Sequence, residues 1–112
     1  MKDFRFHLKY ILESIQMLKE YMDGVSVDQF KTSVQLQDAA IRRLEVIGEA
    51  AKKMPENFRA QYADIPWRKM AAMRDVLAHD YMTLRLDVIW RTVIEDILPL
   101  EPAIKDVIKK EI

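Results

Sequence analysis

The sequence predicts an all-α protein, an antiparallel bundle of four main helices with short helical turns, on the strength of three observations. Apolar residues recur at helical spacing along most of the 112-residue chain. The β-branched alternation typical of strands is absent. Only two glycines and four prolines interrupt the chain, so the connections between helices should be short. Because no repeat, low-complexity tract or linker divides it, residues 1–112 are expected to form a single domain.

The first two long helices are predicted from apolar stripes with a spacing of three and four residues. Asp23-Gly24 should close the first helix, since glycine readily takes the left-handed conformation that ends helices. Ser26 is a candidate N-cap for the segment that follows. The first stripe consists of Phe4, Leu8, Ile11, Ile15, Leu18 and Met22, and the second of Leu36, Ala40, Leu44, Ile47, Ala51 and Met54.

The second half of the chain is divided by its prolines. Gly48, in the middle of the second long helix, is best explained by close approach of another helix. Pro55 should end that helix, leaving 55–62 for at most a short helical turn. A third helix is expected from Pro66 to Ala78. A last apolar stripe runs from Leu86 to Val107 and keeps its phase across two prolines, so it predicts a bent helix or two nearly collinear ones.

Composition limits the classes of function. Lysine and arginine together number 18, as do aspartate and glutamate, which argues against a broad nucleic-acid-coating surface but leaves room for a local cationic pocket. Without cysteine the chain forms neither disulfides nor thiolate metal sites, which favours a reducing cytoplasm. No apolar run approaches the ~20 residues of a membrane span, so no membrane partner is expected.

The segment from Met73 to Tyr81 holds the candidate site. On a helix starting at Pro66, Arg74 falls within the apolar arc, so we expect it to be a buried ion-pair member or a site residue reaching into a cleft. Arg74 and His79 are separated by about 140° on a continuous helix. They can therefore converge only if the helix unwinds near Ala78, or if a second chain completes the site. The first case would place His79 and Tyr81 on one side of an extended exit segment.

These three residue types suit RNA cleavage without a metal. Histidine can take the proton of a 2′-hydroxyl or give one to the leaving 5′-oxygen, arginine can stabilise the phosphoryl oxygens, and tyrosine can bind or stack on a base. Acid and base roles together would be met by a twofold homodimer. The simpler alternative is structural: His79 interacts favourably with the dipole at the C-terminal end of a helix, and Arg74 pairs with a neighbouring acid.

Several blocks in order resemble the HEPN superfamily, and most closely its HepT-like toxins. Arg74 to Tyr81 matches the Arg–four residues–His–any–Tyr signature. Residues 37–50 resemble the family's second-helix block, Ile65-Pro66-Trp67 its lead-in to the motif helix, and Val88-Ile89-Trp90 with Leu98-Pro99-Leu100 its C-terminal block. The resemblance covers most of the chain from Asp38 to Leu100.

The resemblance implies a HEPN-like helical homodimer that acts as a metal-independent endoribonuclease toxin of a type VII-like toxin–antitoxin pair. Arg74 and His79 would be its catalytic pair, and Asp75 would tune the site. A cognate minimal nucleotidyltransferase, the antitoxin, would transfer AMP onto Tyr81. That partner would use ATP and magnesium, whereas this chain would need neither cofactor nor metal.

Two residues depart from the family pattern. Asp75 stands where relatives often carry asparagine, and it puts negative charge beside an RNA-phosphate site. Arg85 replaces an acid that could start the last helix, and with Arg68 and Lys69 it would extend a basic, RNA-binding surface. Two alternatives therefore stay open: a helical dimer that binds RNA or nucleotide without cleaving it, and a structural partner subunit of a nucleotidyltransferase.

Overall fold

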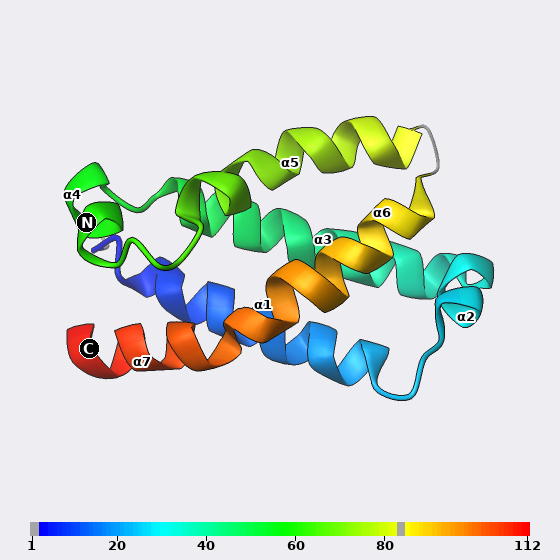
Figure 1. The fold of residues 1–112 in the computed structure, drawn as a ribbon, viewed down its shortest axis with the longest axis horizontal. Coiled ribbons are helices and arrows are strands. Elements are labelled where there is room, and N and C mark those ends of the chain that lie inside the picture. The colour runs from blue at the N-terminus through cyan, green and yellow to red at the C-terminus, as the bar shows by residue number, and fades with distance from the viewer. Residues whose placement is uncertain (1–2, 83–84) are drawn as a thin grey trace.

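The computed structural model describes residues 3–82 and 85–112, without the side chains of positions 76 and 78–82. Its long helices are α1 (Phe6–Met22), α3 (Val34–Lys52) and α5 (Trp67–Met82), followed by an arm made of α6 (Leu86–Arg91) and α7 (Glu101–Glu111). Short helices α2 (Val27–Thr32) and α4 (Glu56–Gln61) lie in the connections. Successive long elements run in opposite directions (Figure 1). The predicted all-α fold is confirmed, with no strand among the described residues.

The core lies where α3 packs against α1 on one side and α5 on the other. Both predicted stripes supply it, and only Phe4 and Leu36 at their beginnings are partly exposed. The fully buried side chains from α1 and α3 include Leu8, Ile11, Ile15, Leu18, Leu44 and Ile47. Burying each of these side chains contributes roughly 1.5–3 kcal/mol, so this seam accounts for much of the stability.

The turn from α1 into α3 forms as the sequence predicts. Gly24 takes a φ of 70°, in the left-handed region that glycine tolerates. Ser26 caps α2 in a capping box with Gln29, with two N–H···O distances of 3.1 and 2.8 Å. The buried Gln37 of α3 donates to two carbonyls at the end of α2, at 2.9 and 3.1 Å, and so fixes α2 against α3.

Aromatic packing sets the start of α5. Pro55 precedes α4 and Pro66 precedes α5, as predicted. Trp67 is 3% exposed, packs against Phe58 with ring centroids 5.9 Å apart, and donates its indole N–H to the Tyr62 carbonyl at 3.0 Å. A tryptophan held in this way belongs to the core and is not a surface for base stacking.

The last arm bends between its two α-helices. A π-helical turn, Thr92–Ile97, leads into a short 3₁₀ turn, Leu98–Leu100, where Pro99 lacks the N–H that a regular α-helix would use. Val93, Ile97, Ile104 and Val107 stay buried through the change, so the predicted stripe keeps its phase. None of the described helices is both long and apolar enough to cross a membrane.

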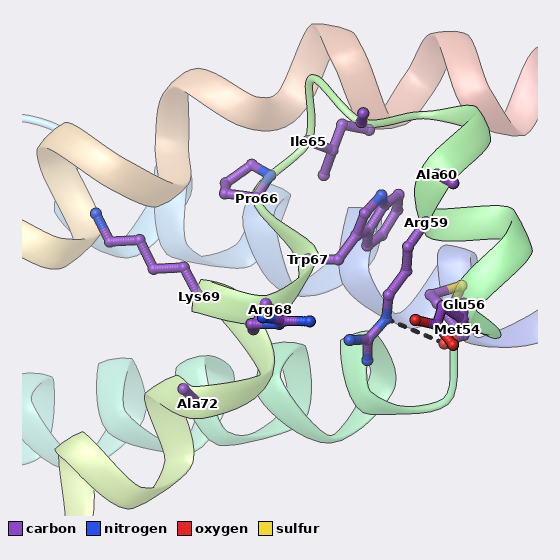
Figure 2. Close-up of a pocket in the computed structure, with 11 residues that line it drawn as sticks. Met54, Glu56, Arg59, Ala60, Ile65, Pro66, Trp67, Arg68, Lys69 and Ala72 are labelled. Atoms are coloured by element: carbon purple, nitrogen blue, oxygen red, sulfur yellow. Dashed lines mark hydrogen bonds between the residues drawn. The ribbon is translucent and has the colours of Figure 1, made fainter.

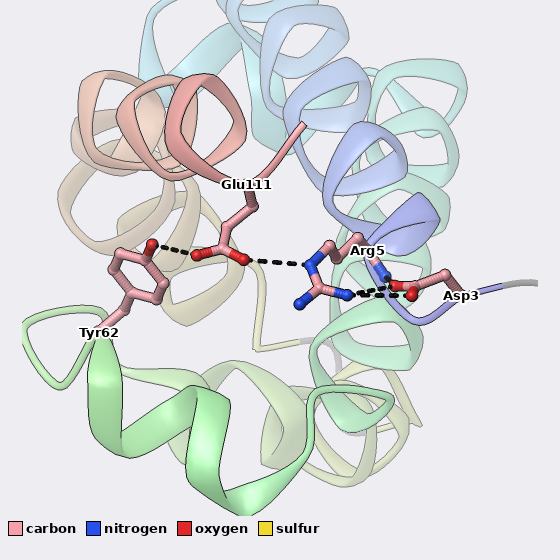
Figure 3. A network of polar contacts seen from close by, with 4 residues as sticks. All are labelled: Asp3, Arg5, Tyr62 and Glu111. Atoms are coloured by element: carbon pink, nitrogen blue, oxygen red, sulfur yellow. Dashed lines mark hydrogen bonds and ion pairs between the residues drawn. The ribbon is translucent and has the colours of Figure 1, made fainter.

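A polar network joins the two chain ends to the α4–α5 connection (Figure 3). The Tyr62 hydroxyl donates to Glu111 at 2.5 Å, and the Arg5 guanidinium contacts the other oxygen of the same carboxylate at 3.1 Å. Arg5 also pairs with Asp3 at 3.0 Å. The hydrogen bond from Tyr62, followed by that from Arg5, lowers the pKa of Glu111, and the same bond to Glu111 raises the pKa of Tyr62.

The shifted pKa of Glu111 predicts a stability that falls in acid. A carboxyl whose pKa is lowered on folding stabilises the protein above its unfolded pKa of about 4.3, and this contribution is lost as the pH falls through the folded value. Tyr62→Phe should therefore lower Tm more at pH 7 than at pH 3, as followed by circular dichroism. Tyr10→Phe, at an exposed tyrosine, is the matched control. An equal loss at both pH values would contradict the coupling.

Candidate functional site

The motif helix is longer than the sequence predicts. The chain was expected to leave the helix near Ala78 and to carry His79 and Tyr81 on an extended segment, but α5 continues to Met82. That expectation was wrong because no proline or glycine follows Ala78 to end the helix. The catalytic candidates Arg74 and His79, the site-tuning Asp75 and the proposed modification target Tyr81 thus all lie on one continuous helix.

Helical register then decides how these positions relate. Positions 74 and 79 are about 140° apart around the axis, whereas positions 74 and 81 differ by about 20° and are two turns apart. His79 and Tyr81, expected on one side, fall on different faces. Their side chains lie outside the described residues. Convergence of Arg74 and His79 through unwinding of the helix near Ala78 is therefore not what the structure has.

Arg74 is exposed, so it is not the buried ion-pair member that was one of its two expected roles. Its side chain is 59% exposed at the edge of the α3–α5 seam, and one of its terminal N–H groups donates to the carboxylate of Glu49 on α3. The buried residues on this side of α5 include Trp67, Met70, Met73 and Leu77, and Arg74 lies among them in register. Its exposure therefore depends on how far α3 covers α5 and not on its direction around the helix. The structure therefore gives Arg74 an ion-pair partner and also leaves it open to solvent.

Gly48 places Arg74 beside α3, as close helix approach predicts. A Cβ built on Gly48 would lie 3.2 Å from the Met70 carbonyl oxygen and 3.6 Å from the Arg74 backbone nitrogen. Any larger residue would push α5 away from α3 at the turn that carries Arg74. The absence of a side chain at Gly48 therefore determines how closely Arg74 approaches its neighbour Glu49.

The other predicted site residues are exposed, in several surroundings. Asp75 lies on the solvent side of α5, next to Arg74. Arg85 precedes α6 without a side-chain capping hydrogen bond, as expected for a residue that has no hydrogen-bond acceptor in its side chain. Arg68 and Lys69 lie on the first turn of α5, and Lys69 approaches Asp96 at 3.6 Å. The structure therefore does not bring the three basic candidates together with Arg74 in one cluster.

Sequence reasoning missed Arg59, which joins Arg68 at an open depression between α4 and α5 (Figure 2). Its guanidinium donates to the carbonyls of Ala51 and Met54 at 3.1 Å each and so satisfies the C-terminal end of α3. No sequence signal identifies this role, since Arg59 lies on a six-residue helix without a repeating pattern.

This arrangement can hold an anion at Arg74. Because the hydrogen bond to Glu49 uses one of five guanidinium donors, others can reach a phosphoryl oxygen. Both carboxylates beside it, Glu49 and Asp75, oppose a second negative charge and would tune that affinity downward. Among the side chains that the structure describes, which leave out those of 76 and 78–82, no group of three His, Asp or Glu is suited to a metal.

Comparison with known proteins identifies relatives along nearly the whole chain. The family model described as "Ribonuclease HepT-like" matches residues 11–109. A protein of Caldanaerobacter subterraneus named "Putative RNase" is 38% identical over 111 residues, covering 99% of both chains. The "Probable ribonuclease HepT" of Thermococcus cleftensis is 41% identical over 95 residues, covering 85% of this chain and 86% of its own.

One relative is larger. A protein of Methanocaldococcus jannaschii named "Gamma-glutamylcyclotransferase and putative RNase" is 43% identical over 109 residues, which are 97% of this chain and 49% of that protein. This chain therefore spans about half the length of that relative. No solved structure matches the chain significantly.

The close approach at Gly48 predicts that Gly48→Ala is destabilising. Alanine gains about 1 kcal/mol of helix propensity, but its Cβ meets a backbone carbonyl that moves only with α5, and overpacking of this kind costs about 1–3 kcal/mol. We expect Tm to fall by a few degrees in thermal unfolding. The control is Ala39→Gly, which changes propensity at a partly exposed position of the same helix. A higher Tm for Gly48→Ala would contradict this prediction, because it would show that α5 can move away from α3 at little cost in free energy.

Proposed function

Because the chain belongs to the ribonuclease HepT-like family, we propose that it is a metal-independent endoribonuclease and the growth-arresting toxin of a type VII-like toxin–antitoxin pair. Membership of the family supports the ribonuclease function. The observation that carries the rest is Arg74, a half-exposed guanidinium held at the α3–α5 seam on the same helix as His79. We place this reaction in the cytoplasm, where a cysteine-free chain and its RNA substrate would meet.

The proposed chemistry needs one proton removed and one supplied. A base takes the proton of the 2′-hydroxyl, whose oxygen attacks the adjacent phosphorus, and the bond to the 5′-oxygen breaks as an acid protonates it. The products are a 2′,3′-cyclic phosphate and a 5′-hydroxyl. His79 serves as base or acid near neutral pH, while Arg74 stabilises the more negative phosphoryl group of the transition state.

A homodimer would complete the site. One continuous helix directs positions 74 and 79 about 140° apart, so one copy alone does not converge the two groups in the way that the reaction requires. Two copies related by a twofold axis would present two histidines and two arginines to one cleft, supplying both the acid and the base.

The proposed partner is a minimal nucleotidyltransferase that silences this site. The Tyr81 hydroxyl would attack the α-phosphorus of ATP, lose its proton and release pyrophosphate, leaving AMP on the tyrosine. Position 81 lies about 10.5 Å beyond position 74 along the same strip of α5. A tethered phosphate there could occupy the Arg74 guanidinium and exclude RNA. The ATP and magnesium belong to the partner's reaction.

One observation favours a second candidate function, RNA or nucleotide binding without cleavage. Arg74 already has Glu49 as a partner and Asp75 as its neighbour, so two carboxylates surround the candidate catalytic cation. A structural subunit of a nucleotidyltransferase complex is the third possibility, for which neither Arg74 nor His79 would affect RNA binding. The next experiment separates the three.

The purified protein should cleave single-stranded RNA in the presence of EDTA. Arg74→Ala and His79→Ala should each lower the rate by about 10²-fold or more, because general acid–base and electrostatic contributions are of that size. Circular dichroism should show both variants folded, and Lys109→Ala on α7 should behave as wild type. A folded His79→Ala protein with full activity would refute the enzyme. Intact RNA bound by wild type and lost in Arg74→Ala would establish the binding module.

Coexpression with a cognate minimal nucleotidyltransferase should add one or more AMP groups to Tyr81. Intact-mass and peptide mass spectrometry should find them on the peptide that contains Tyr81. Tyr81→Phe should abolish the modification and retain RNA cleavage in the partner's presence, whereas Tyr10→Phe should be modified and silenced like wild type. AMP on another residue, or silencing of Tyr81→Phe, would contradict the assignment.

A further inference from the structure

A basic groove lies between α4 and the first turns of α5, away from Arg74 (Figure 2). We propose that it binds the segment of single-stranded RNA next to the cleaved bond, with Arg59 and Arg68 as its phosphate contacts. This inference rests on the proposed ribonuclease function and assigns the part of the substrate that lies beyond the reacting phosphate. The groove is lined by Met54, Glu56, Arg59, Ala60, Ala63, Ile65, Pro66, Trp67, Arg68, Lys69 and Ala72.

Two positively charged side chains, Arg59 and Arg68, meet at the groove. Figure 2 shows the side chains of Arg59 and Arg68 extending toward one another from α4 and α5. Arg68 forms no ion pair with a described residue, and Arg59 donates to two neutral carbonyls, so no described carboxylate neutralises either guanidinium. Two like charges directed at one depression repel each other, and a phosphate between them would turn this repulsion into attraction. Glu56 is the single acidic residue among those that line the groove.

The apolar lining is the second argument. Ala60, Ala63, Pro66 and Ala72 are exposed along the groove, while Trp67 beneath them is 3% exposed. Small apolar side chains leave room for a ribose and the face of a base, with no requirement for a particular base. A positively charged groove that follows the phosphate backbone is one component of sequence-tolerant single-strand binding.

Position along α5 is the third argument. Positions 68, 72, 75 and 79 are spaced by four, three and four residues, which puts them on one face of the helix. The groove residues Arg68 and Ala72 therefore lie in line with the position of His79. Eleven residues span about 16.5 Å of helix axis, a length of several phosphates along a strand. A strand cut near position 79 and lying along α5 would reach the groove only if it extends several nucleotides from the cut.

The test measures how much affinity RNA gains from length. Binding of a dinucleotide and of a ten-nucleotide single strand is compared in a His79→Ala background, so that cleavage does not interfere. We expect Arg68→Glu and Ala72→Glu to lower the affinity for the longer strand about tenfold or more and to reduce the salt slope by about 0.7 or more for the arginine. Lys109→Glu makes the same change of charge on the exposed face of α7, and the ten-nucleotide strand should keep its full advantage in affinity over the dinucleotide.

Both groove variants replace exposed residues, so they should fold, which thermal unfolding checks. Arg59 is not the test residue because it also satisfies the end of α3. The groove assignment would be overturned if the ten-nucleotide strand bound the His79→Ala protein no more tightly than the dinucleotide. It would also be overturned if adding Arg68→Glu, like adding Lys109→Glu, left the ratio of the two affinities the same as in the His79→Ala protein. These outcomes are separate from failure of the proposed function, which is the absence of RNA cleavage by the wild-type protein.

Discussion

The contact between α3 and α5 at Gly48 is the constraint on which the rest of the structure depends. With no side chain at this position, the backbone of α5 lies against α3 at Met70 and Arg74. Both long helices can then bury their apolar stripes in one seam, and α1 covers the other side of α3. The same contact brings Glu49 and Arg74 together at the edge of the seam. Core packing and the position of the candidate arginine are thus consequences of a single close approach.

The charges around α5 follow a gradient along the helix. At its beginning, Arg59 and Arg68 face a groove with one acid, while in its middle Arg74 lies beside Glu49 and Asp75. Net attraction for a polyanion is therefore greater at the groove than beside Arg74. In the proposed reaction, this distribution would place most of the binding energy for RNA away from the phosphate that reacts. It also explains how a chain with balanced charge can favour RNA locally.

The helices could be predicted from sequence because their signals are local. Gly24 ends a helix through its backbone conformation, Ser26 starts one through its side-chain hydroxyl, and the stripes of α1 and α3 show burial directly. The end of α5 and the exposure of Arg74 could not be predicted from sequence. Periodicity gives the direction of a side chain around its helix, but it does not show how much of that face the neighbouring helix covers. Arg59 escaped notice for a related reason: its partners are main-chain carbonyls eight and five residues earlier, which no side-chain pattern records. The network from Asp3 to Glu111 joins chain ends that no spacing rule connects.

That network also holds both chain ends at one end of the helical bundle, where a further domain would be joined. Both chain ends lie at the pole where α4 and the start of α5 meet, while α5 finishes at the opposite pole (Figure 1). A domain fused through either end would emerge far from positions 79 and 81 and would leave that end of the helix accessible. The Methanocaldococcus relative, in which the matching region is 49% of a longer protein, is an arrangement that this geometry tolerates. The architecture therefore lends itself to modular fusion without rebuilding the motif helix.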